Sequence, residues 1–155
     1  MGLRPLVLSL LLVPVLSQAS SSQTVLTQTD SDQVMAAGEA SARLLKAPVC
    51  IAVVDQSGLL LAFKRMDDAP PGCIEASIAK ARAAALYRTA TLALMQRVNG
   101  QEPAMATLPG MVPLGGGTPI HDTGKVIGAV GVSGSNNPNE VRISEQAAAG
   151  YGHTS

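Results

Sequence analysis

The sequence predicts an α+β domain in which several helices pack on a five-stranded antiparallel sheet. Two observations lead to this α/β fold class. Segments with a helical apolar period alternate along the chain with short β-rich runs, and brief turns separate them. The chain has 155 residues, of which 46% are hydrophobic and 14% are charged. A chain of this size buries one core but hardly two, so we expect a single domain.

Four helices are expected. Thr27 to Asp30 has the spacing of a capping box, and the apolar period that follows indicates a helix up to about Lys46, which Pro48 closes. Three further helices are expected. They are Ile74 to Leu86, which has an alanine-rich period, Ala90 to Arg97 and Pro138 to Gly150.

Five strands are expected in addition. Val49 to Val54 and Leu59 to Met66 flank turn residues and form a hairpin. Asn99 to Leu108 is a surface loop. The three strands after it are Met111 to Leu114, Pro119 to His121 and Val126 to Val132.

The N-terminus has the pattern of a signal peptide. Arg4 precedes an apolar run from Leu6 to Leu16 that is too short to span a bilayer. Ser17-Gln18-Ala19 then has small residues at both ends, as signal peptidase requires, so Ser20 is the expected first mature residue. We expect residues 1–19 to be a signal peptide, residues 20–155 to be the mature domain, and the protein to be periplasmic or secreted.

The two cysteines leave a choice open. An oxidising compartment permits a disulfide between Cys50, in an apolar strand, and Cys73, near a helix start. Sequence alone does not show whether their Cα atoms come within bridging range. Two separate buried thiols are the favoured interpretation.

Charge excludes one class of partner. The 11 basic and 11 acidic side chains cancel, and the chain has one Phe, two Tyr and no Trp. Proteins that bind nucleic acids usually carry a basic stripe interleaved with aromatic residues. We therefore expect no nucleic-acid partner, and no membrane span either.

Five sequence blocks resemble the haem-binding family that contains the glycolate-operon G protein and the C-terminal domain of propanediol-utilisation protein O. The likeness covers about residues 26 to 151, and the blocks are Ile51 to Gly58, Phe63 to Ala69, Lys80-Ala81, Leu114 to Ile120 and Val126 to Gly134. The resemblance implies a profilin-like or PAS-like α/β layer fold. It also implies assembly into homo-oligomers, from dimers to octamers, and, for several members, binding or degradation of haem.

Few residues of this sequence are of the types that ligate haem iron or line a haem pocket. His121 is the candidate metal ligand, and Met111 is a candidate for the wall of a pocket. Gly115, Gly116 and Gly117 present backbone without side-chain bulk, which suits either the floor beneath a bulky ligand or close packing between subunits. The plainer interpretation of His121 is a solvated histidine at a turn.

A second hypothesis is a cofactor-free enzyme that acts on a small carboxylated or carbonyl metabolite. Lys80 lies in the middle of an alanine-rich helix, where burial would turn its amine into a base or nucleophile. Arg65 would hold a carboxylate beside Asp67. The plainer alternative is a lysine that reaches water and a surface pair between Arg65 and Asp67.

We favour the first hypothesis, in which an exported domain binds haem or a similar flat cofactor and serves haem handling or redox sensing. The expected pocket lies near Arg65, Lys80, the triple glycine and His121.

Overall fold

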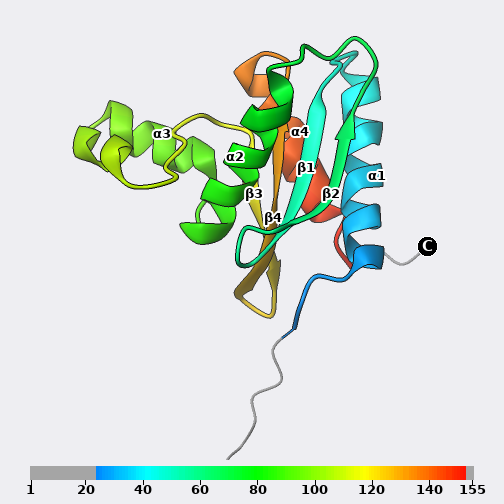
Figure 1. The fold of residues 1–155 in the computed structure, drawn as a ribbon, viewed down its shortest axis with the longest axis horizontal. Helices are drawn as coiled ribbons and strands as arrows, with labels where there is room; N and C mark the ends of the chain where they lie inside the picture. Colours follow the sequence, from blue (N-terminus) through cyan, green and yellow to red (C-terminus); the bar gives the residue numbers. More distant parts are fainter. Residues whose placement is uncertain (1–23, 153–155) are drawn as a thin grey trace, which may run out of the picture.

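A computed structural model describes residues 24–152 of the chain (Figure 1). The helices are α1 (Gln28–Leu44), α2 (Cys73–Leu86), α3 (Thr91–Asn99) and α4 (Asn137–Ala149), and a short 3-10 helix, η1, covers Pro103–Thr107. The strands are β1 (Cys50–Asp55), β2 (Leu60–Arg65), β3 (Gly117–Asp122) and β4 (Lys125–Ser133). The four expected helices are therefore confirmed, with ends that differ by one or two residues.

The sheet has four strands in the order β2-β1-β4-β3, and all neighbours are antiparallel. The expectation of five strands was wrong, because Met111 to Leu114 forms no strand. Met111 donates its N–H to the carbonyl of Leu108, and Leu114 donates to Val112, so this segment turns on itself. Pro113 between them has no N–H to offer a ladder.

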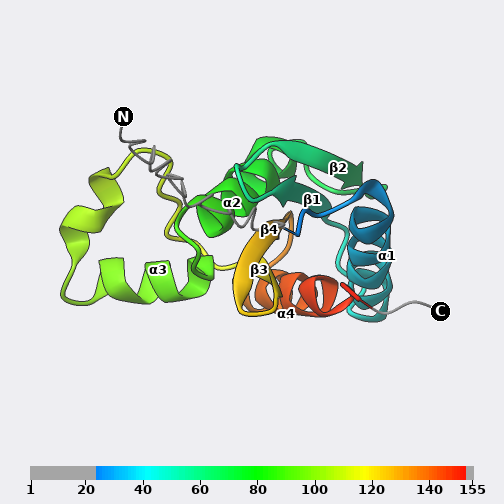
Figure 2. The same cartoon turned by 90° about the horizontal axis from the view of Figure 1, so that it is seen from below.

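Helices cover both faces of the sheet (Figure 2). On one face, α1 and α4 enclose the larger core, which includes Val34, Ile51, Val132 and Ile143. The capping box of α1 is present: the side chain of Thr27 accepts from the N–H of Asp30, whose carboxylate accepts from the N–H of Thr27. On the other face, α2 packs on Ala52, Val54 and Ala129.

The α2 helix lies unusually close to β4, because small residues meet at the contact. A Cβ placed on Gly131 would lie only 2.5 Å from the backbone nitrogen of Ala81 and would overlap the carbonyl oxygen of Ser77. No real Cβ tolerates such distances. The glycine is therefore required for this helix to rest on this strand.

The segment that contains α3 and η1 projects sideways from the rest of the domain (Figures 1 and 2). Two polar contacts fix its shape: the guanidinium of Arg97 pairs with Glu102 at 2.6 Å, and the Tyr87 hydroxyl donates to the carbonyl of Pro109 at 2.6 Å. Leu108 and Leu114 are 43% and 53% exposed on this segment. The expected surface loop is thus a structured arm.

Cys50 and Cys73 form a disulfide, and the expectation of two separate thiols was wrong. Cys50 begins β1 and Cys73 begins α2, and their Cα atoms lie 5.5 Å apart because α2 starts over the end of β1. Both residues are buried, together with Ala69. The bond fixes the start of α2 to the sheet.

Within residues 24–152, no helix is both long and apolar enough to cross a membrane. The predicted signal peptide, residues 1–19, lies outside the described residues, and so does His153.

Candidate functional site

Lys80 is buried at the junction of α2, β4 and α4. Its Nζ lies 2.7 Å from Oε2 of Glu140 and donates to the carbonyl of Val132 at 3.2 Å. The two charged side chains are 4% and 7% exposed. The expectation that Lys80 is desolvated holds, but its charge is matched by a carboxylate that the sequence analysis did not single out.

The second oxygen of Glu140 is also occupied. Its Oε1 accepts from the N–H of Gly134 at 2.8 Å and from the N–H of Ser135 at 3.1 Å. Two amide donors and one ammonium therefore compensate for the removal of this carboxylate from water. The only sequence signal for Glu140 was its place in the first turn of a helix that follows Ser133-Gly134-Ser135.

The triple glycine packs directly against this cluster. Gly116 has a φ of +111°, and a Cβ there would lie 2.7 Å from the carbonyl oxygen of Val132 and 3.4 Å from Nζ of Lys80. A Cβ on Gly117 would lie 2.5 Å from the carbonyl oxygen of Lys80. The glycines thus serve close packing within the chain, which is neither the ligand floor nor the subunit packing expected from the sequence, and they seal the Lys80 amine from solvent.

The buried cluster suits a structural role better than catalysis. The amine of Lys80 has a carboxylate and a carbonyl as partners, and its side chain is only 4% exposed. A nucleophilic amine must be neutral and reachable by its substrate. In this conformation Lys80 is buried, and the carboxylate of Glu140 is its counter-charge.

Arg65 and Asp67 lie elsewhere, on the outer strand β2 and the turn after it. The Nε and Nη2 atoms of Arg65 donate to the carbonyl of Ala69 at 3.0 and 2.7 Å. Both side chains line a cleft of about 210 Å³ with Arg43, Lys64 and Met66. Among the described residues no ion pair joins Arg65 to Asp67. Arg65 lies on the outermost strand of the sheet, whereas Lys80 lies on α2 and pairs with Glu140 of α4.

His121 occupies the opposite end of β3 from the triple glycine. It is exposed and lines a cleft of about 370 Å³ together with Gln56, Arg88, Gly124, Lys125 and Val126. The cleft brings together the β1–β2 turn, the β3–β4 turn and the segment after α2. An imidazole and two cationic side chains therefore share one opening.

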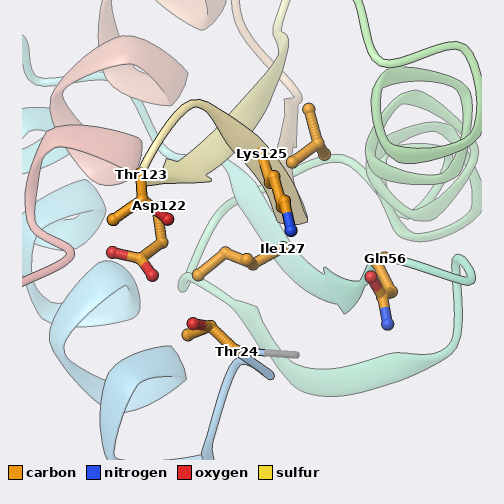
Figure 3. A pocket seen from close by; sticks show the side chains of 7 residues that line it. Thr24, Gln56, Asp122, Thr123, Lys125 and Ile127 are labelled. Atoms are coloured by element: carbon orange, nitrogen blue, oxygen red, sulfur yellow. The ribbon is translucent and has the colours of Figure 1, made fainter. Parts of the chain in front are cut away.

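A smaller cleft of about 60 Å³ adjoins it and shares Gln56, Lys125 and Val126 (Figure 3). Figure 3 shows the side chains of Asp122 and Thr123 on the side of this hollow away from Gln56. Lys125 thus lines both openings, together with Gln56 and Val126.

The single pocket expected from the sequence is divided in the structure. Lys80 and the triple glycine come together at one end of β3, while His121 lies four residues away, about 13 Å along the strand. Met111 lines neither the His121 cleft nor the cleft beside Arg65. No group of three or more His, Cys, Asp or Glu residues with metal-binding geometry occurs in the described part of the chain.

Fold and site together define a small α+β protein whose open cleft offers an imidazole and two cations, beside a sealed ion pair. The chain belongs to the family of haem-degrading, HbpS-like proteins, whose model matches residues 26–149. The resemblance inferred from the five sequence blocks is therefore confirmed.

Two curated relatives are similar over most of the chain. Protein GlcG of Escherichia coli is 41% identical over 112 residues, which cover 72% of this chain and 84% of GlcG. An uncharacterised 15.0 kDa protein from the dhaT-dhaS intergenic region of Citrobacter freundii is 35% identical over 136 residues, which cover 83% of this chain and 93% of that protein.

Solved structures share the fold. HbpS of Streptomyces reticuli, in a double-mutant form, has a TM-score of 0.80 at 28% identity over 91% of this chain and 98% of its own. PduOC, solved as a complex with haem, has a TM-score of 0.74 at 29% identity over 83% of this chain and 96% of its own.

Proposed function

We propose that this chain is an exported haem-binding protein and that the His121 cleft receives the haem. The observation that carries the proposal is an exposed imidazole that shares a cleft with two cationic side chains, in a member of a family that includes a structure solved with haem. Haem bound there would supply iron chemistry, and the role we propose is haem handling or redox sensing.

The polar residues of the cleft match the chemistry of haem. Haem iron accepts an imidazole nitrogen as an axial ligand, and His121 offers one at the surface. Haem also carries two propionate groups, which need cations. Arg88 and Lys125 line the same cleft, and neither pairs with a carboxylate within residues 24–152.

An apolar wall for the macrocycle lies beside these groups. Val126 lines the cleft, and Leu86, two residues before Arg88, is 53% exposed. Leu86 also approaches Gly58 of the same β1–β2 turn that contributes Gln56. The tetrapyrrole would therefore stack on aliphatic side chains with its carboxylates toward Arg88 and Lys125.

Export is supported by two independent features. The leader pattern of residues 1–19 is one, and the disulfide between Cys50 and Cys73 is the other. Disulfides persist in oxidising compartments such as the periplasm and are rare in the reducing cytosol. We therefore place the mature protein in the periplasm or outside the cell.

Assembly into a homo-oligomer is part of the proposal. The arm formed by α3 and η1 projects from the domain and exposes Leu108 and Leu114. Exposed apolar surface of this kind, where it forms a contiguous patch, marks sites of protein–protein contact. Light scattering at micromolar concentration should report a mass above that of a monomer.

The test of the haem site is a titration of hemin into the purified mature protein. We expect a saturable Soret band, which His121→Ala shifts because the axial imidazole is lost. His153→Ala is the matched control, since it removes the other histidine of the chain. Arg88→Gln and Lys125→Gln should weaken hemin binding without moving the band.

Three outcomes separate the parts of the proposal. Absence of saturable binding to the wild-type protein would overturn haem binding itself. A band that is the same in His121→Ala and wild type would overturn the ligand assignment. A band that moves only in His153→Ala would transfer the axial role to the C-terminal histidine.

A further inference from the structure

The β2 strand forms one edge of the sheet, and its outer side is open. Only β1 pairs with it among residues 24–152. The N–H of Met66 donates to the carbonyl of Val49 across the ladder. Because main-chain groups alternate in direction along an antiparallel strand, those of Phe63 and Arg65 point away from β1. An extended chain can therefore pair with this edge.

A row of apolar side chains borders the open edge. Phe63 pairs with Ala52, and Leu60 pairs with Val54, so both lie on the face of the sheet that carries α2. The α2 helix lies mainly over β4 and β1 and hardly reaches β2. We call this row the edge strip; its members and their exposed fractions are Leu59 (63%), Leu60 (44%) and Phe63 (36%).

A guanidinium group stands at each end of the edge strip. Arg65 donates through Nε and Nη2 to the carbonyl of Ala69, and Arg82 donates through Nε to the carbonyl of Gly58 at 3.1 Å. Neither arginine forms an ion pair within the described part of the chain. A carbonyl fixes the direction of a guanidinium but leaves its charge available.

We propose that the β2 edge binds an extended segment of a partner protein that has apolar residues at its centre and an acidic residue toward each end. Main-chain hydrogen bonds to an exposed edge supply affinity, and alternate side chains supply specificity. Leu60 and Arg65 lie five residues apart, about 17 Å along the strand. The two acidic residues of the partner should therefore be five to six residues apart.

Charge disfavours a second copy of this chain as the occupant. Antiparallel pairing of two β2 strands about their centre would place Arg65 of each copy opposite Leu60 of the other. Arg82 is held close to that end of the strip, at Gly58. Two guanidinium groups would then meet at each end, and like charges at such positions are destabilising. Acidic residues at the same positions would be attracted.

The test uses the mature protein without haem and a fluorescent octapeptide with valine and threonine at its centre and glutamate near both ends. We expect saturable binding by fluorescence anisotropy. Arg65→Gln and Arg82→Gln should each weaken the affinity by about tenfold, the loss expected for one charge-assisted hydrogen bond. Arg142→Gln, which removes an exposed guanidinium on α4, on the opposite face of the sheet, should leave the affinity unchanged.

Two further peptides test the mode of binding. A peptide with lysines in place of the glutamates should not bind wild-type protein but should bind the Arg65→Glu/Arg82→Glu double variant. A peptide with N-methylated main chain should not bind at all, because the ladder hydrogen bonds are lost.

The proposal is overturned if the acidic peptide fails to bind, or if the N-methylated peptide binds equally well. It is also overturned if sedimentation shows that Phe63→Lys reduces the mass of the wild-type assembly, since the occupant would then be a second copy. None of these measurements uses haem, so they are independent of the His121 cleft.

Discussion

Lys80 and Glu140, 60 residues apart in the sequence, form an ion pair of 2.7 Å that is almost completely removed from solvent. The pair connects α2 to α4 at the end of β4, where Val132, Gly134 and Ser135 supply the remaining hydrogen bonds. Each charge is tolerated in the interior only because the other is present. The pair therefore couples the helices on the two faces of the sheet.

Removal of one member of this pair should be costly. Lys80→Met leaves the Glu140 carboxylate buried without its counter-charge, which typically lowers the free energy of unfolding by about 3–5 kcal/mol. Urea denaturation followed by circular dichroism measures the change. The double variant Lys80→Met/Glu140→Leu should lose less than the sum of the two single variants, because it leaves no unpaired charge.

Lys64→Met is the matched control for that experiment. Lys64 forms an ion pair of the same length with Glu39, but its side chain is 47% exposed. Exposed pairs contribute less than about 1 kcal/mol. Equal losses in Lys80→Met and Lys64→Met would contradict the role assigned to the buried pair.

Gly131→Ala should damage the contact between α2 and β4. The added methyl group overlaps the backbone of Ser77 and Ala81, so the helix must move away from the sheet. Overpacking of this kind costs about 1–3 kcal/mol or more. Gly72→Ala, whose Cβ would meet nothing within 4 Å, should change the unfolding midpoint little. Similar midpoints for both variants would refute the close-packing argument.

The disulfide should contribute about 3 kcal/mol to stability, since it closes a loop across 23 residues. We expect Cys50→Ala/Cys73→Ala to unfold at a correspondingly lower urea concentration while its far-ultraviolet spectrum stays native. Thiol titration of unfolded wild-type protein, without a reductant, should detect no free cysteine. Two reactive thiols per chain would show that the bond is absent.

Glu102 should titrate below the usual range of glutamate. The hydrogen bonds from Arg97 lower the pKa of its carboxyl, and partial desolvation opposes that effect without reversing it. A lowered pKa in the folded state means that the pair stabilises the arm above the ordinary pKa and that this contribution disappears as the pH falls through the folded-state value. Side-chain carboxyl titration by NMR should show the pKa of Glu102 rising in Arg97→Gln.

Export has a direct signature in the mass of the protein. If residues 1–19 are removed by signal peptidase, intact-mass analysis of protein from the native host should give an N-terminus near Ser20. The same sample should be lighter by two hydrogens than the reduced chain. Retention of Met1 in the folded protein would contradict export.

Local sequence patterns predicted the helices and four of the strands because capping residues, turn residues and apolar periods act over short distances. They failed at Met111 to Leu114, where turn hydrogen bonds use the N–H groups that a strand would need. They also failed to pair Cys50 with Cys73, because that contact depends on how α2 crosses the sheet.

The candidate site was predicted only in pieces. Lys80 and the triple glycine do meet, but the partner of Lys80 comes from a helix 60 residues later, which no local pattern reveals. Residue spacing also does not show which end of a strand faces a cleft, so His121 was grouped with residues from the opposite end of β3.

The close approach of Gly131 to Ala81 limits how this chain can diverge over evolution. A larger residue at either position is accepted only if α2 moves outward, and a shifted α2 would disturb both Lys80 and the disulfide at its start. Substitutions at positions 81 and 131 should therefore be rare and should arise together, with a small residue always retained at one of the two. Across related chains, these two positions should vary less than the exposed residues of the His121 cleft, which are free to change with the ligand.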